Sequence, residues 1–368
     1  MTDMSILTAE ERVIFSLRSL YRRYGYLQYK MSKFEEYEFY MHNKDFLVSD
    51  RIIAFNDTNG KLLALKPDVT LSIIKSGEDT KGYKQKVCYN ENVYRVSEST
   101  GQYKEIMQTG VECIGDIDLY DIYEMILLAG ESLALISDDF ILEISHVDLL
   151  MDLFSKVCDN RMFLQDAMRY FSQKNAHELS RVCDDFGVSE EDKRVLVSFV
   201  SIYGERKKVL SMIKDMSGYV SESAVSELEK LSAMLDTLPF SDKIIFDFSD
   251  VNNVNYYNGI AFKGFISGVS QSVLSGGRYD RLLKKLGRRS GAVGFAIYID
   301  MLLDIYKSEE ECDVDLLVVY DGQSDMMALA DTVKSAVASG IKVSAQKTVT
   351  DKIRYKEMKD MRGGTGNA

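Results

Sequence analysis

A glutamine and a glutamate spaced along one strand give the clearest chemical signal in this sequence. Residues 92–115 read NVYRVSESTGQYKEIMQTGVECIG, two strand-like stretches joined by a polar turn at 97–101. Alternation along the second strand places Gln108, Gly110 and Glu112 on one face. An amide and a carboxylate around a glycine could line a groove that holds an ammonium and an amide or imidazole group. An ordinary exposed hairpin face has the same pattern, so both interpretations stay open.

A second polar pair stands at the start of a helix. The segment Lys66-Pro67-Asp68-Val69-Thr70 precedes a helical pattern at 71–75. Either Asp68 or Thr70 is well placed to cap the first turn of that helix. The functional alternative is that both side chains face a site at the helix N-terminus, and capping alone explains these residue types equally well.

A basic cluster follows two glycines late in the chain. Gly276 and Gly277 permit a tight turn with backbone close to a ligand or to a neighbouring strand. The cluster consists of Arg278, Arg281, Lys284, Lys285, Arg288 and Arg289. A solvated helix face is the default interpretation, and a docking patch for an acidic partner or for phosphate is the alternative.

Composition limits the class of protein. A length of 368 residues predicts two or three domains, and 46% hydrophobic with 28% charged residues is ordinary for a soluble globular protein. The net charge of −12 argues against broad non-specific nucleic-acid binding. The cysteines form no CxxC pair and the histidines lie far apart, so we expect reduced thiols and no metal site. Neither an apolar run of membrane length nor a targeting signal stands out, which predicts a cytoplasmic protein without membrane contact.

The order of the predicted elements favours an α+β fold. A helix with a capping box at Thr8 and Glu11 comes first, and an Asn-Gly turn at 59–60 predicts a hairpin. The pattern from about 149 to 238 is helical, which predicts a mainly helical insertion. Further strands are predicted at 140–147, 243–248 and 269–274, a turn and strand at 256–262, a buried strand or strand-helix junction at 291–299, and one βαβ unit at 314–345. Hairpins rather than regular βαβ alternation indicate an antiparallel-rich sheet flanked by helices.

Four stretches, in the right order, resemble the class II aminoacyl-tRNA synthetase core of the histidyl type. They are KPDVTLSIIK at 66–75, the hairpin at 92–115, NVNYYNGIAFKGF at 253–265, and the segment at 275–303 that begins SGGRYD. The resemblance covers roughly residues 8–310. It implies that the histidine-binding groups of that family fall on Asp68, Thr70, Gln108, Glu112, Tyr256 and Tyr257. The first three can hold an α-ammonium, and Glu112 with the tyrosines can hold and orient an imidazole.

The departures from the synthetase pattern concern the groups that would bind a nucleotide. Arg95 matches the arginine of motif 2 and is a residual phosphate-site residue, but the second basic position of that motif is Gln102. The family's catalytic arginine falls on Asn252, and the Glu-Arg pair of motif 3 falls on Asp300-Met301. Each lost preorganised cation should lower the rate roughly 10²–10³-fold. We therefore expect no synthetase chemistry, no catalytic residue and no cofactor.

A histidyl-type core that keeps the amino-acid pocket and loses the nucleotide machinery resembles the regulatory subunits of ATP phosphoribosyltransferase. The resemblance implies a non-catalytic subunit that pairs with a short-form catalytic subunit in histidine biosynthesis and mediates feedback inhibition by histidine. It further implies a homodimer within a hetero-oligomer and no tRNA binding. The expected domains are a core over 1–310, with the insertion at 149–238, and a partial anticodon-binding-like α/β unit with a frayed tail over 311–368. A divergent histidyl-tRNA synthetase is one alternative, and a synthetase-like module for another amino acid or partner is the other.

Overall fold

The chain folds into two compact units, residues 1–303 and 304–368. The structure, a computed structural model, describes residues 7–47, 51–77, 79–96, 100–249, 256–302 and 312–363. No helix within these ranges is long and apolar enough to cross a membrane.

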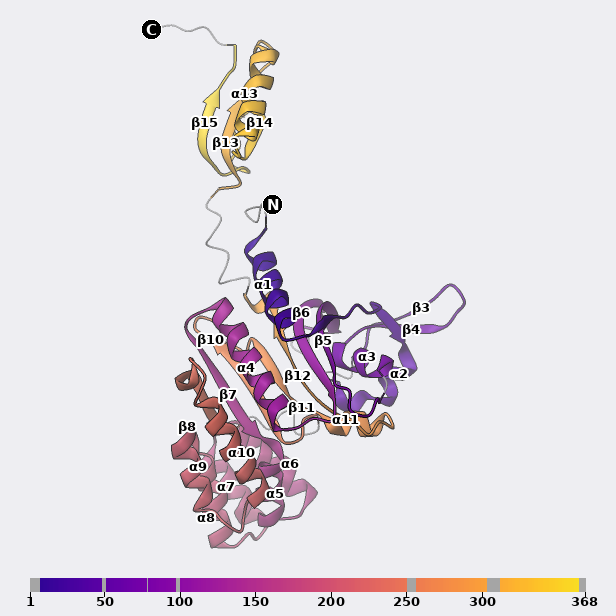
Figure 1. The fold of residues 1–368 in the computed structure, drawn as a ribbon, viewed down its shortest axis with the longest axis vertical. Coiled ribbons are helices and arrows are strands. Elements are labelled where there is room, and N and C mark those ends of the chain that lie inside the picture. Colours follow the sequence, from indigo (N-terminus) through magenta and orange to yellow (C-terminus); the bar gives the residue numbers. More distant parts are fainter. Residues whose placement is uncertain are drawn as a thin grey trace. The chain divides into compact units, whose positions relative to one another are not determined.

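A nine-stranded sheet forms the centre of the first unit (Figure 1). Its order is β1-β5-β6-β12-β11-β10-β7-β9-β8. The strands are β1 (Leu27–Gln28), β5 (Gln85–Val96), β6 (Tyr103–Gly115), β7 (Phe140–His146), β8 (Tyr203–Glu205), β9 (Ile244–Asp247), β10 (Ile260–Ile266), β11 (Leu274–Arg278) and β12 (Gly291–Tyr298). All pairings from β5 across to β7 are antiparallel. The antiparallel-rich sheet predicted from the hairpin signals is therefore confirmed.

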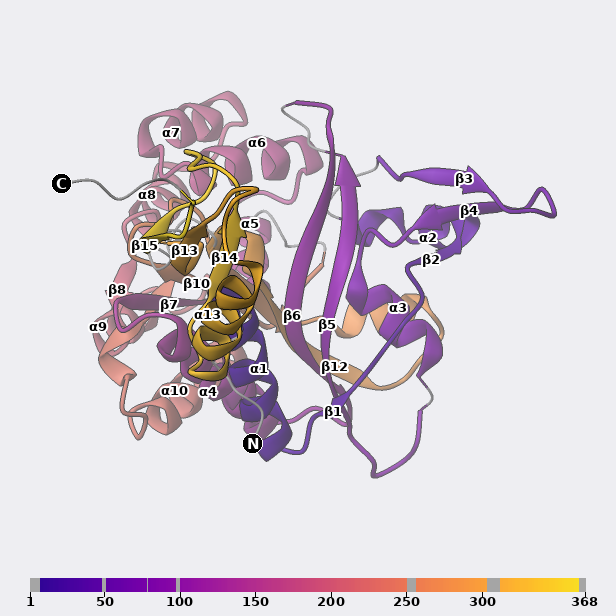
Figure 2. The same ribbon diagram turned by 90° about the horizontal axis from the view of Figure 1, so that it is seen from above.

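Two helices cover one face of this sheet, α1 (Ala9–Arg23) and α4 (Leu119–Ile136), as Figures 1 and 2 show. The predicted capping box of α1 is present, because Thr8 and Glu11 exchange backbone-to-side-chain hydrogen bonds. Helix α4 packs closely at Gly130, where an added Cβ would lie 2.1 Å from the ring of Phe240. Glycine at this position thus allows α4 to pack directly against the ring of Phe240.

A small sheet and short helices form a lobe beside β5. The sheet order is β2-β4-β3, with strands β2 (Phe34–Glu36), β4 (Leu62–Leu65) and β3 (Ala54–Asn56). The predicted hairpin between β3 and β4 is confirmed, and Gly60 adopts φ +81° in its turn. The helices are α2 (Tyr37–His42), the 3-10 turn η2 (Lys44–Phe46), α3 (Val69–Ser76) and α11 (Asp280–Lys285).

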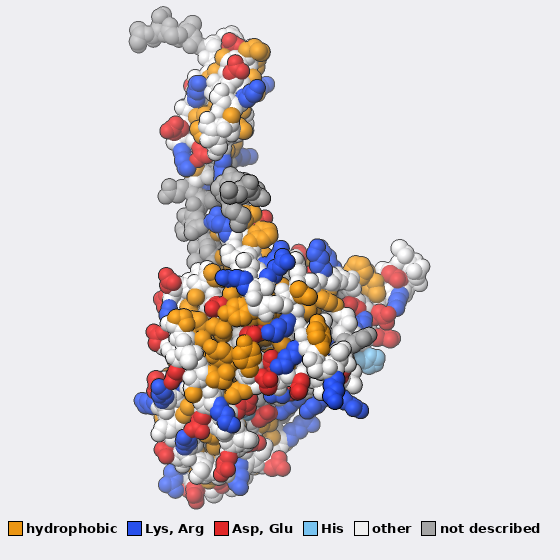
Figure 3. All heavy atoms as spheres, in the orientation of Figure 1, with side chains coloured by type: hydrophobic (Ala, Val, Ile, Leu, Met, Phe, Trp, Pro, Cys, Tyr) orange, Lys and Arg blue, Asp and Glu red, His pale blue; other side chains and the backbone are white. Residues whose placement is uncertain are grey.

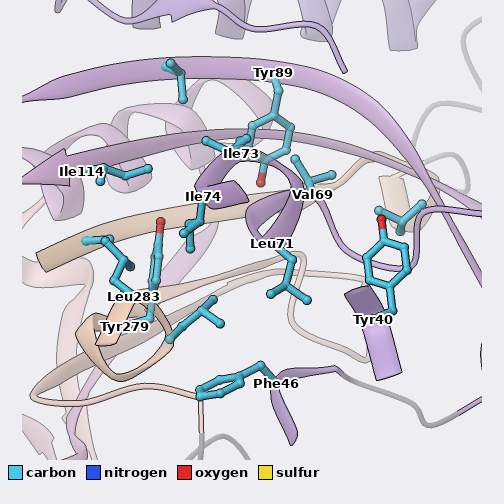
Figure 4. Close-up of a cluster of buried hydrophobic side chains, with 14 of the residues drawn as sticks. Tyr40, Phe46, Val69, Leu71, Ile73, Ile74, Tyr89, Ile114, Tyr279 and Leu283 are labelled. Atoms are coloured by element: carbon cyan, nitrogen blue, oxygen red, sulfur yellow. The ribbon is translucent and has the colours of Figure 1, made fainter. Parts of the chain in front are cut away.

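An apolar cluster holds α3 in place (Figure 4). Leu71 and Ile74 of α3 are buried together with Tyr89 of β5 and Leu283 of α11. Residues at i and i+3 lie on the same face of a helix, so this packing fixes the direction in which the N-terminus of α3 points.

Six helices lie between β7 and β9, in a region that is described throughout. They are α5 (Val147–Val157), α6 (Arg161–Ser172), α7 (Ala176–Asp185), α8 (Glu190–Phe199), α9 (Arg206–Lys214) and α10 (Glu222–Leu235). The same region contributes β8, which pairs with β9 at the edge of the large sheet. The sequence pattern did not predict this strand, because three residues carry too little alternation to be recognised.

The second unit contains β13 (Val314–Val319), α13 (Met326–Ala338), β14 (Val343–Gln346) and β15 (Tyr355–Asp360) within residues 312–363. The strand order is β14-β13-β15, and both pairings are parallel. The predicted βαβ unit is present, but β15 was missed. Its sequence YKEMKD is almost wholly exposed, so it offers no apolar face to recognise. Most of the tail predicted to fray lies outside the described residues.

One strand prediction was wrong. The strand expected at 269–274 lies instead at Leu274–Arg278, so Gly276 and Gly277 belong to β11 and not to a tight turn. The other expectation for these glycines, close approach to a neighbouring strand, is confirmed. A Cβ on Gly276 would lie 2.5 Å from Phe295 Cβ and 2.6 Å from the carbonyl oxygen of Gly294. The local signal of a turn was therefore a signal of tight strand packing.

Candidate functional site

The six predicted binding residues and Arg95 line one pocket, called here the small pocket, with a volume of about 80 Å³. It lies at the N-terminus of α3, against β6, β11 and β12. The other lining residues are Tyr89, Ser275, Tyr279, Gly294, Phe295, Ala296 and Tyr298. Residues far apart in the sequence thus surround one space suited to a small polar ligand.

Asp68 both caps α3 and faces the small pocket. Its Oδ1 accepts a hydrogen bond from the Leu71 N–H at 2.8 Å, so Asp68, and not Thr70, is the cap. Both side chains are 9% exposed. Burial raises the pKa of Asp68, and the Leu71 N–H and the Arg95 guanidinium oppose that rise. The carboxyl group has one oxygen engaged by the helix and belongs to the pocket lining, so its two possible roles are compatible.

Glu112 is the most enclosed acid of the small pocket, only 2% exposed. The Thr70 hydroxyl donates to its Oε1 at 2.7 Å, and the Tyr279 hydroxyl donates to its Oε2. Burial raises the pKa of Glu112 to about 8; these two hydrogen bonds lower it, and the nearby Asp68 raises it. This raised pKa favours the protonated form of Glu112 at pH 7. A cationic ligand group beside it would favour the ionised form.

The part of β6 that carries Gln108 and Glu112 is not an exposed hairpin face. Every residue from 108 to 115 is buried, so that interpretation was wrong for this half of the strand. Gly110 lies between the two side chains, and a Cβ there would lie 2.5 Å from the Tyr89 hydroxyl. The glycine thus makes room for a neighbouring tyrosine that also lines the pocket.

Three tyrosines form an aromatic wall. The ring centroids of Tyr256 and Tyr257 are 4.9 Å apart, and those of Tyr256 and Tyr279 are 5.8 Å apart. Burial raises the pKa of each hydroxyl above its ordinary value, so all three remain neutral hydrogen-bonding groups. The wall combines apolar ring faces with polar tips, an arrangement suited to a planar ligand group.

Tyr279 and Gly294 also line the small pocket, and neither was among the site residues predicted from the sequence. Tyr279 stands inside the SGGRYD segment and binds Glu112, whereas Gly294 pairs with Glu112 across β12 and β6. A Cβ on Gly294 would lie 1.7 Å from Glu112 Oε2. The segment itself was the available signal for Tyr279. Gly294 could be recognised only from a strand pairing that spans about half of the chain.

The lining of the small pocket is sparse in positive charge. Among the described residues that line the small pocket, Arg95 alone is cationic. Its Nε donates to the carbonyl oxygen of Pro67 at 3.0 Å. Asp300 accepts the backbone N–H of Met107 at 3.0 Å. Asn252 lies outside the described residues. The described part of the chain also has no group of three or more His, Cys, Asp or Glu side chains placed to hold a metal ion.

Comparison with known proteins gives a consistent result. The histidyl-tRNA synthetase family model matches residues 5–302. An ATP phosphoribosyltransferase regulatory subunit from Caldanaerobacter subterraneus subsp. tengcongensis is 29% identical over 290 residues, which are 78% of this chain and 76% of that protein. A crystal structure described as an ATP phosphoribosyltransferase regulatory subunit/histidyl-tRNA synthetase from Bacillus halodurans is 25% identical, with a TM-score of 0.76 and coverage of 97% and 94%.

A third match is an ATP phosphoribosyl transferase (HisG:HisZ) complex from Thermotoga maritima, which shows the same fold at 19% identity, with a TM-score of 0.63 and coverage of 79% and 97%. The class II synthetase-like fold predicted from the sequence is confirmed, as is the resemblance to the regulatory subunits. The chain therefore belongs to the histidyl-tRNA synthetase family.

Proposed function

We propose that this protein is a non-catalytic regulatory subunit of ATP phosphoribosyltransferase that binds free histidine in the small pocket. Relatives that match most of the chain carry that name. The single observation that carries the proposal is the convergence of all six expected histidine-binding residues on a pocket with one cation in its described lining. Such a pocket suits an amino acid better than a triphosphate.

The chemistry of the small pocket matches the groups of histidine. The Asp68 carboxyl, with Thr70 and Gln108, would hold the α-ammonium. Glu112 would accept a hydrogen bond from the imidazole, whose plane would lie against the tyrosine wall. Charged or polar partners would therefore meet the α-ammonium and one imidazole nitrogen of the ligand, and the ammonium would offset the cost of burying two carboxyl groups.

Loss of synthetase chemistry is part of the proposal. A synthetase must stabilise charge on the phosphates of ATP, and Arg95 is the one cation in the described lining. The alternative function, a divergent histidyl-tRNA synthetase, is favoured by the family model. Pyrophosphate exchange that depends on both histidine and ATP would establish that alternative and contradict ours.

The proposed partner is the short-form catalytic subunit, and the similar ATP phosphoribosyl transferase (HisG:HisZ) complex from Thermotoga maritima supports it. Feedback inhibition would follow if histidine favoured one state of the complex by about 1–3 kcal/mol. The proposal also includes a homodimer, a cytoplasmic location and no tRNA binding. It treats residues 1–310 as the core, 149–238 as its insertion, and 311–368 as a partial anticodon-binding-like unit.

Asp68→Asn tests the histidine site. Asparagine caps a helix as well as aspartate does, so α3 should keep its stability. The ammonium would lose a charged partner, and charge-assisted hydrogen bonds contribute about 1.5–3 kcal/mol, so histidine affinity should fall at least tenfold. Calorimetric titration measures the affinity. Co-purification with the catalytic subunit should be unchanged, whereas inhibition of the complex by histidine should require higher concentrations.

The matched control is Asp118→Asn, which alters another N-cap aspartate, that of α4, outside the small pocket. It should leave histidine affinity unchanged. If the unaltered protein binds no histidine, or if both variants lose affinity equally, the proposed site is wrong.

A further inference from the structure

A second and larger pocket, called here the large pocket, lies beside α11 with a volume of about 600 Å³. Its walls come from the loop at 79–85 after α3, from 114–117 at the end of β6, and from positions between 278 and 291. It shares no lining residue with the small pocket. Its volume lies within the range of small-molecule sites.

The lining of the large pocket is more positive than the chain as a whole. Its cations are Lys81, Arg278, Lys284, Arg288 and Arg289, and its acids are Asp79, Asp116 and Asp280. The lining therefore has two positive charges in excess, in a protein whose net charge is −12. Figure 3 shows Lys and Arg side chains gathered over α11. A local positive field of this kind attracts anions.

Two of the acids hold the framework of the pocket. Asp79 accepts hydrogen bonds from Arg288 Nε at 2.9 Å, from the Arg289 N–H at 2.7 Å and from the Ser290 hydroxyl. Arg288 also donates to the carbonyl oxygen of Ile74 at 3.0 Å, which ties the segment to the end of α3.

Asp280 plays the corresponding part at the other end of the segment. It accepts from Arg278 Nε at 2.8 Å and from the Ala292 N–H at 3.0 Å. Two arginines and two aspartates thus neutralise each other while they fix the loop.

Three cations remain over after this pairing. In the part of the chain that the structure describes, the side chains of Lys81, Lys284 and Arg289 form no hydrogen bond or ion pair, and all three are exposed. Asp116, also exposed, is the remaining acid. Unpaired cations around one hollow repel each other, and a bound anion relieves that repulsion.

We propose that the large pocket binds a small phosphate-bearing molecule. Ammonium and guanidinium groups are the usual partners of phosphate oxygens, and a ligand with two or more negative charges would match the excess. The cations line a hollow and not a raised face, which favours a small ligand over an acidic protein segment. Tyr83 lines the same pocket and is 57% exposed, so its ring is available to stack on a base attached to the phosphates.

Neighbouring lysines on α11 provide a matched test. Lys284 lines the large pocket without a partner, whereas Lys285 lies outside its lining and pairs with Asp45 at 3.0 Å. Both substitutions to alanine remove one positive charge. Lys284→Ala should weaken pyrophosphate binding about fivefold or more, because a charge-assisted contact is lost, and Lys285→Ala should change it less than twofold. Titration calorimetry of the full chain with pyrophosphate at low ionic strength measures both.

Several outcomes separate this site from the histidine site and from other ligands. The combined variant Lys81→Ala, Lys284→Ala, Arg289→Ala should lose pyrophosphate binding while it keeps histidine affinity and thermal stability. Tighter binding of ATP than of pyrophosphate, reduced by Tyr83→Ala, would identify a nucleotide, and equal binding would identify a phosphate group alone. Equal losses from Lys284→Ala and Lys285→Ala would overturn the proposal. The proposal would also be overturned if neither pyrophosphate nor ATP bound, or if an acidic peptide alone did.

Discussion

In the small pocket Glu112 is enclosed by β6, β12 and tyrosine rings, and burial raises its pKa to about 8. In the large pocket Asp79 lies at the surface among hydrogen-bond donors, which lower its pKa to about 2. The same functional group is thus held neutral in one place and charged in the other. The difference shows that enclosure and nearby hydrogen-bond donors, more than the functional group itself, set the charge of a carboxyl group.

One segment of the chain serves both pockets. Tyr279 donates to Glu112 in the small pocket, while Arg278 and Asp280, its neighbours in sequence, line the large pocket. The small pocket is built mainly by strands whose backbones approach closely, whereas loops and a short helix build most of the large one. Substitutions should therefore disturb the small pocket far more than the large pocket.

The largest effect should come from Gly294→Ala. The new Cβ would lie 1.7 Å from Glu112 Oε2 and 2.6 Å from the carbonyl oxygen of Val111, so the strand or the acid must move. We expect a loss of about 4 kcal/mol in the free energy of unfolding, at the upper end for single substitutions. Urea unfolding measures this. Gly322→Ala, where an added Cβ meets nothing within 4 Å, should be nearly neutral, and equal stability of both variants would contradict the described packing of β6 against β12.

The sequence was sufficient where structure depends on neighbours along the chain. The capping box at Thr8, the Asp68 cap and the turn at Gly60 are all local, and each was predicted or left as one of two options. The residues expected to bind histidine were predicted through a family resemblance, which carries long-range information that spacing alone lacks. Their convergence on one pocket agrees with that resemblance.

The features that could not be predicted from the sequence depend on contacts between distant segments of the chain. The glycines of β11 looked like a turn because their close contacts, Gly276 with Phe295 and Gly277 with the Ile260 carbonyl oxygen, are made with neighbouring strands. Burial of Glu112 could not be predicted from an alternating polar pattern, since that pattern does not say which face is covered. The division of the basic cluster into paired and unpaired cations likewise depends on Asp79, about 200 residues away from Arg288.

A smaller effect is expected from the pH dependence of Glu112. Its pKa is raised from 4.5 in the unfolded chain to about 8 in the folded one. The contribution of Glu112 to the free energy of unfolding is therefore fully present below pH 4.5 and declines as pH rises towards 8. The reason is that the unfolded chain releases a proton that the folded chain keeps. The full shift in pKa would lower the free energy of unfolding by about 1.4 kcal/mol for each pH unit between the two pKa values. We expect a smaller total decline of roughly 2–3 kcal/mol, because a pocket admits some water.

Glu112→Gln keeps the shape of the side chain and cannot ionise. Its unfolding free energy should therefore lack this decline between pH 5 and pH 8, measured by urea titration without histidine. A decline equal to that of the unaltered protein would mean that another group titrates in this window.

The smallest effect should come from Asp79→Asn, and it should lie in the opposite pH range. Hydrogen bonds from Ser290, the Arg289 N–H and Arg288 lower the pKa of Asp79 from 3.8 to about 2. Its contribution is thus present above pH 3.8 and is lost as pH falls through about 2. Asparagine should remove the loss of unfolding free energy at acid pH, while the decline towards pH 8 stays. The change in unfolding free energy should be small, because Asp79 is partly exposed and its charge is screened by solvent. If Asp79→Asn instead abolishes the decline in stability between pH 5 and pH 8, the two pockets do not hold their carboxyl groups in the opposite states inferred for them.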